Sequence, residues 1–126
     1  MTPAKFSAIR TANERYVRAI EANDMKAAVR ANEEMHFALY HAAGSSLMLS
    51  IIEGLWLQSG PYLAAVMKAM SDKEPAALPE KGSAHHFQLL AALSKGDGDA
   101  AGAALADDIR DAAEWYRQAI FDAPAR

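Results

Sequence analysis

Residues 24–44, DMKAAVRANEEMHFALYHAAG, contain the pattern that decides the fold. Apolar residues recur there at steps of three and four, as they do on one face of an amphipathic helix. Asp24 is of a type preferred as the N-cap of a helix, and Gly44 is of the type preferred just after a helix end. The stretch therefore predicts one helix that begins after Asp24 and stops at Gly44.

The same periodicity continues along the rest of the chain, which is rich in alanine and has no long alternation of apolar and polar residues. We predict further helices over residues 3–22, 46–70 and 83–95, and from 97 or 99 to 121. Short turns between most of them favour antiparallel neighbours. The expected fold is an all-α, antiparallel helical bundle of about five to six helices.

Several local signals mark where these helices begin, bend and end. Thr2 is the expected N-cap of the first helix. Gly60–Pro61 should kink or break the third helix, because proline lacks a backbone donor and clashes with the preceding turn. Residues 72–82 contain two prolines and a glycine and are expected to form the main loop, and residues 123–126 are expected to fray.

Composition limits the classes of protein to which the chain can belong. It has 126 residues, the size of one domain, a net charge of −3 and no cysteine, for which a reducing cytoplasm is the simplest explanation. The longest uncharged stretch, residues 37–52, is too short and too polar to span a bilayer. Lys and Arg are scattered rather than gathered on one face, so the chain alone is not expected to bind DNA.

Four polar residues occupy interior positions of the predicted helices. Asn32 and His36 fall on the apolar stripe of residues 24–44, and His86 and Asp108 fall on the stripes of the fourth and fifth helices. Aspartate is rarely buried unless it is paired or coordinated. Facing helices of a bundle build metal sites from such groups, and two histidines with a carboxylate suit Zn²⁺, Ni²⁺, Mn²⁺ or Fe²⁺. The alternative is a set of hydrogen-bonded core residues without a metal.

Two further histidines lie near these positions in the sequence. His41 lies off the stripe that carries His36, and His85 is rotated away from His86. We therefore expect His41 and His85 at the surface or at the rim of the site.

Three segments resemble the FadR C-terminal (FCD) effector domain of GntR-family transcription regulators. NEEMHFALYHAAG (32–44) is similar to the family segment Asp-x-x-Phe-His-x-x-Leu-x-x-Ala-Ala-Gly. HFQLLAALSKGD (86–97) resembles His-x-x-Ile-x-x-Ala-Ile-x-x-Gly-Asp, and LWLQSGPYL (55–63) is typical of one branch of the family. The resemblance extends from about residue 12 to residue 116.

This resemblance implies a metal site built from one aspartate and three histidines. By position, these ligands correspond to Asn32, His36, His86 and Asp108. Asn32 stands where the family has aspartate and Asp108 where it has histidine, so two histidines and one carboxylate are kept. We expect a divalent ion, with Zn, Ni or Mn as candidates and an altered metal preference. The alternative is a lost site that is now held by hydrogen bonds between histidine and aspartate.

The resemblance also implies a small organic-acid effector beside the metal. Family members often carry an arginine in the third helix, whereas this chain has Gln58 near that position, on one stripe with Tyr62. Glutamine lacks the charged, forked donors of arginine. Gln58 and Tyr62 are therefore expected to hydrogen-bond a less charged ligand, the alternative for both being ordinary packing.

The expected organisation is a single FCD-like domain over residues 1–126. The family's winged helix-turn-helix normally precedes this domain, so contact with DNA is expected only through a domain missing here. We predict a homodimeric small-molecule sensor that is not an enzyme. Two alternatives stay open: a metal-dependent enzyme, although no further inward Glu or Lys is available as a base, and a structural dimerisation module that uses Trp56, Met67, Met70 and Trp115.

Overall fold

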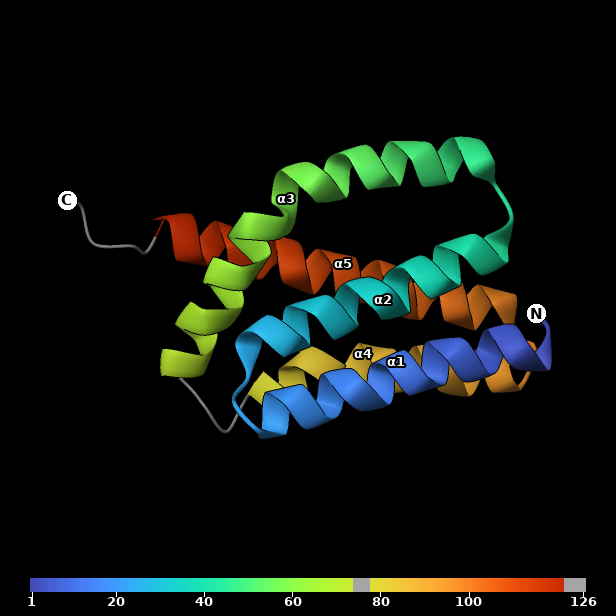
Figure 1. Ribbon diagram of the computed structural model, residues 1–126, viewed down its shortest axis with the longest axis horizontal. Coiled ribbons are helices and arrows are strands. Elements are labelled where there is room, and N and C mark those ends of the chain that lie inside the picture. Colours follow the sequence, from blue (N-terminus) through green and yellow to red (C-terminus); the bar gives the residue numbers. More distant parts are fainter. Residues whose placement is uncertain (74–77, 122–126) are drawn as a thin grey trace. The chain divides into compact units, whose positions relative to one another are not determined.

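The computed structural model describes residues 1–73 and 78–121, and this part of the chain forms helices and no strand (Figure 1). The helices are α1 (Pro3–Glu21), α2 (Met25–Ala43), α3 (Ser46–Lys73), α4 (Leu78–Ser94) and α5 (Gly98–Phe121). The prediction of an all-α helical bundle is confirmed. The chain divides into two compact units, Met1–Ala64 and Ala65–Arg126. Among the described residues, no helix has the length and apolar character needed to cross a membrane.

In the first unit α1 packs against α2. Thr2 accepts a hydrogen bond from the backbone N–H of Lys5 at 3.3 Å, which confirms it as the N-cap of α1. The buried residues of the two helices include four alanines, larger apolar residues such as Ile9 and Met35, and the polar Asn13 and His36. Small side chains let two helix backbones approach closely, so the alanine richness of the sequence serves this contact.

The turn between α1 and α2 has the backbone that its residues predict. Asn23 adopts a positive φ of 55°, which asparagine tolerates better than most residues. The Asp24 carboxylate accepts from the backbone N–H of Ala27 at 3.1 Å and caps α2. Gly44 ends α2 in the left-handed region at φ 81°. Both predicted boundaries of α2 are therefore confirmed.

In the second unit α4 packs against α5. Gly96 follows the end of α4 at φ 71°, and the Asp97 carboxylate accepts from the backbone N–H of Ala100 at 3.0 Å. Asp97 is thus the N-cap of α5, one of the two starts that the sequence allowed.

The predicted loop over residues 72–82 and the predicted start of the fourth helix at Ser83 are wrong. Helix α3 extends to Lys73, and α4 begins at Leu78, five residues before Ser83. Pro79 is the second residue of α4, where the missing N–H costs nothing because the first turn has no intrahelical acceptor for it. Residues 74–77 of the predicted loop and the tail, residues 122–126, lie outside the described residues.

Of the predicted kink or break at Gly60 and Pro61, the break is wrong, because α3 continues through both residues. The ribbon of α3 nevertheless bends along its length (Figure 1). The hydroxyl of Ser59 donates to the carbonyl of Leu55 at 3.0 Å, beside the backbone hydrogen bonds of that turn. A proline inside a helix removes one backbone bond but does not have to end the helix.

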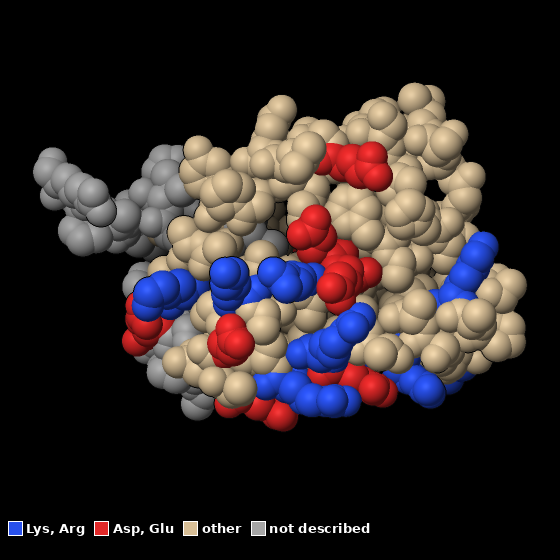
Figure 2. All heavy atoms as spheres, viewed as in Figure 1, with Lys and Arg blue, Asp and Glu red and all other residues tan. Residues whose placement is uncertain are grey.

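Charges of both signs are mixed on the face that Figure 2 shows. Lys and Arg side chains alternate with Asp and Glu over α1 and α2. One of these pairs joins the two helices, with Arg15 Nη2 2.9 Å from Glu34 Oε2. This face therefore carries no strongly basic patch, in keeping with the scattered Lys and Arg of the sequence.

Candidate metal centre

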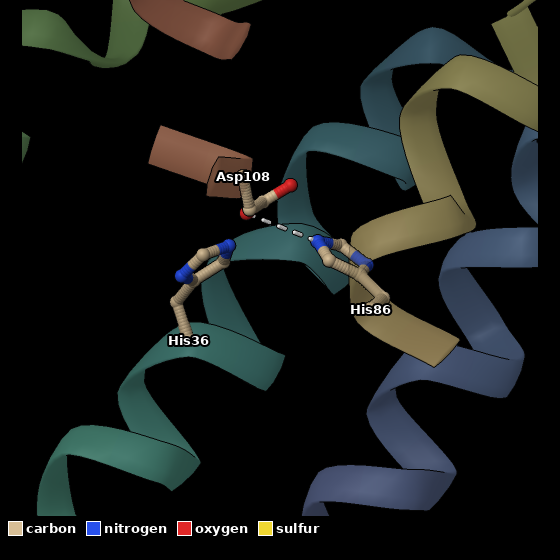
Figure 3. Close-up of side chains that lie close together, drawn as sticks. All are labelled: His36, His86 and Asp108. Carbon is tan, nitrogen blue, oxygen red and sulfur yellow. Dashed lines mark ion pairs between the residues drawn. The ribbon is translucent and has the colours of Figure 1, made fainter. Parts of the chain in front are cut away.

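The second unit contains a buried imidazole beside a carboxylate. His86, on α4, is 1% exposed, and its Nε2 lies 3.4 Å from Oδ2 of Asp108, on α5 (Figure 3). Asp108 is half-buried in the apolar stripe of its helix. The 3.6-residue period of each helix thus turns both groups toward the α4–α5 contact, as the stripes predicted.

The donor atoms of this pair fit a divalent cation. An imidazole nitrogen and a carboxylate oxygen are the ligand types that Zn²⁺ and its neighbours in the first transition row accept. Without a cation the same two groups form an ion pair or a hydrogen bond, according to the protonation of His86. The geometry of the pair is compatible with both alternatives that the sequence left open.

A second link between α4 and α5 lies beside the first. His85 Nε2 donates to Oδ2 of Asp111 at 2.6 Å, and His85 Nδ1 donates to Oε1 of Gln88 at 3.2 Å. Since both ring nitrogens face acceptors, the protonated ring is favoured, and the hydrogen bond to Asp111 is the main cause of the raised pKa of His85. His85 is half-buried, at the rim where it was expected, but its bridging role was not predicted.

His36 is held within the first unit by aromatic neighbours. It is 4% exposed on α2, and its Nδ1 lies 3.1 Å from the hydroxyl of Tyr40, one turn further along. The ring of Trp56, on α3, lies 5.5 Å from the His36 ring and 5.3 Å from Phe37, in a T-shaped contact with the latter. Tilted and edge-on contacts are the favourable arrangements of aromatic rings. These neighbours fix the orientation of the imidazole.

The other predicted site residues of the first unit are less enclosed. Asn32 is half-buried on α2, one turn before His36, whereas His41 is exposed as expected. Gln58 and Tyr62 are both exposed on α3. Figure 3 draws the candidate ligands with acidic or imidazole groups: His36 from α2, His86 from α4 and Asp108 from α5.

Sequence reasoning missed Tyr40 and Asp111. Tyr40 follows His36 by four residues, a spacing at which helical side chains meet, so a signal was present. Asp111 follows Asp108 by three residues, a spacing at which side chains share one helix face, so a second acidic group beside Asp108 could have been noticed.

Comparison of the sequence with known proteins identifies a family for this chain. The sequence model of the FCD domain matches residues 1–111. The chain is 31% identical over 97 residues to the HTH-type transcriptional regulator McbR of Escherichia coli (strain K12), a match that covers 77% of this chain. The chain spans only 42% of the length of that relative. No solved structure matches the chain.

The chain therefore belongs to the FCD domain family. It is a regulatory domain of the ligand-sensing class, which is the class that its sequence segments resemble.

Proposed function

We propose that this chain is the metal-assisted sensing domain of a GntR-type transcription regulator and that its effector is a small organic acid. The observation that carries the proposal is the buried His86 imidazole beside the Asp108 carboxylate. Burying an aspartate and a histidine among apolar residues costs free energy unless the two groups are paired or coordinate an ion. Membership in the FCD family and the likeness to a transcriptional regulator support a role of this site in ligand sensing.

His36, His86 and Asp108 are the proposed ligands of the cation, with the amide oxygen of Asn32 as a neutral fourth. That the two units together form one coordination sphere is part of the proposal. Two neutral imidazoles and one carboxylate would leave a divalent ion with one net positive charge. When bound, the ion would supply that charge and an open coordination position to the carboxylate of the effector.

Tyr40 supports His36 in this role. If Nδ1 of His36 carries the proton and donates to the Tyr40 hydroxyl oxygen, the lone pair lies on Nε2. Metal-bound histidines commonly donate their second ring N–H to such a partner, which fixes the tautomer and the ring orientation.

Gln58 and Tyr62 are proposed to bind the uncharged, polar part of the effector. Both side chains can donate and accept hydrogen bonds without adding a charge.

The same proposal includes a location in the cytoplasm and a homodimeric state. A DNA-reading domain outside this chain would transmit the response to DNA.

The test begins with metal-free protein prepared in chelator and then titrated separately with Zn²⁺, Ni²⁺ and Mn²⁺ by calorimetry. We expect one ion per chain, lost in His86→Ala and Asp108→Ala and kept in His41→Ala, which removes an exposed histidine of α2. Mono- and dicarboxylates should then raise the melting temperature of the metal-loaded protein more than that of the metal-free protein. The absence of stoichiometric binding of any of the three ions would refute the proposal.

A further inference from the structure

Helix α3 carries an apolar face that the described residues leave uncovered. Leu47, Met48, Ile51 and Leu55 are between 50 and 71% exposed. At about 100° per residue, these four positions fall within a sector of roughly 100° on the helix surface. They form one continuous stripe, called here the α3 apolar face. Scattered exposed hydrophobic residues are ordinary, whereas a contiguous stripe of this kind marks an interaction surface.

Charge is nearly absent from this part of the molecule. From Ser46 to Tyr62 the only charged residue is Glu53, whose position in the helical repeat is on the side opposite the α3 apolar face. Figure 2 shows uncharged side chains over the first half of α3, with a single acidic group among them. A partner that is recognised by its charge would find no complementary group here.

The residues that the sequence offered for an interface are not part of the α3 apolar face, and Trp115 lies on α5. Trp56 contacts His36 and Phe37 within the first unit, so its ring is used inside the fold. The side chains of Met67 and Met70 lie outside the described residues. The α3 apolar face is formed by other positions of the same helix.

We propose that two copies of this chain associate through the α3 apolar face as an antiparallel pair of α3 helices. The inference deepens the homodimer of the proposed function by naming its surface, and it does not depend on a metal. A face without charges is complementary to itself, as a twofold symmetric interface requires. Complete burial of the four residues would cover roughly 450 Å² per copy, or about 900 Å² in all, which is in the range of weak or transient interfaces.

The spacing of the four residues also fixes the register. In an antiparallel pair whose twofold axis passes at Ile51, each Ile51 faces its counterpart, and Leu47 faces Leu55 of the partner. The stripe then lies symmetrically about the axis. Leu57, 82% exposed, lies well away from the stripe on the same helix and provides a matched control.

Sedimentation velocity over a range of concentrations tests the association. The native chain should be a dimer, and Ile51→Glu or Leu55→Glu should raise its dissociation constant by about 30-fold or more. Leu57→Glu should remain a dimer, and circular dichroism should show unchanged helix content in all three variants. In Leu47→Lys/Leu55→Glu, opposite charges would face each other, so the dimer should return. A monomeric native chain, or a dimer that survives both glutamate variants, would overturn the proposal.

Single cysteines test the register independently, because the chain contains none of its own. Ile51→Cys should form a disulfide between copies under mild oxidation, and Leu57→Cys should not. Equal cross-linking of the two variants would contradict the proposed pairing. Metal titration of the monomeric variants separates the two proposals. If a monomeric variant still binds metal, the proposed function is retained. If the native chain forms the dimer without binding metal, the proposed interface is retained.

Discussion

At the scale of single residues, Tyr40 tests whether His36 is a metal ligand. Tyr40→Phe removes the hydroxyl that lies 3.1 Å from Nδ1 of His36 and keeps the ring that packs beside Phe37. Loss of such a supporting bond typically weakens metal binding by 10- to 100-fold, so calorimetry should report a decrease of at least roughly tenfold. Tyr62→Phe, which removes an exposed hydroxyl on α3, should leave the affinity for the metal alone unchanged. Equal affinities of Tyr40→Phe and the native chain for the metal would count against His36 as a metal ligand.

His85 makes a pH-dependent contribution to stability. Its pKa is raised in the folded chain, chiefly by the hydrogen bond to Asp111. The stabilisation is therefore complete below the ordinary histidine value of about 6.5 and disappears as the pH rises through the raised value. In the presence of a chelator, the free energy of unfolding of the native chain should exceed that of Asp111→Asn by more at pH 6 than at pH 9. The NMR titration of the His85 ring, assigned by its loss in His85→Gln, should shift to lower pH in Asp111→Asn; an unchanged midpoint would show that the bond does not form.

At the scale of elements, the helix ends depend on the left-handed backbone of particular glycines. Gly96 has φ 71° after α4, so Gly96→Ala should lower the free energy of unfolding by about 1 kcal/mol. Gly102 lies inside α5 with nothing within 4 Å of an added Cβ, and Gly102→Ala should raise the same quantity by about 0.5–1 kcal/mol. Urea unfolding followed by circular dichroism measures both. The prediction fails if the two alanines change stability in the same direction.

The helix boundaries show what the sequence could and could not predict. Caps such as Asp24 and Asp97 are local, because the side chain bonds a backbone N–H three residues away, so their positions could be predicted. The start of α4 was misplaced because Pro79 fits either a loop or the first turn of a helix. Burial of His86 followed from periodicity, but the hydrogen bonds of His85 depend on rotamers of two different helices, which no pattern in one helix specifies.

At the scale of the whole molecule, the proposed function requires that one cation take ligands from both compact units. His36 belongs to the unit Met1–Ala64, whereas His86 and Asp108 belong to Ala65–Arg126. A ligand that binds only the folded state stabilises every element that must be ordered to bind it, by about 2.7 kcal/mol at a hundred times its dissociation constant. Metal binding should therefore slow local opening in both units rather than in one.

Hydrogen exchange read by mass spectrometry measures this coupling. On addition of Zn²⁺, amides of α2 around His36 and amides of α4 and α5 around His86 and Asp108 should gain protection together. In His36→Ala the gain in α2 should disappear, while any weak binding by His86 and Asp108 would protect only α4 and α5. His41→Ala, on the same helix as His36, should behave as the native chain does. Protection confined to α4 and α5 in the native chain would mean that the ion is held by the second unit alone, and His36 would then be a buried residue of the aromatic cluster with Tyr40 and Trp56.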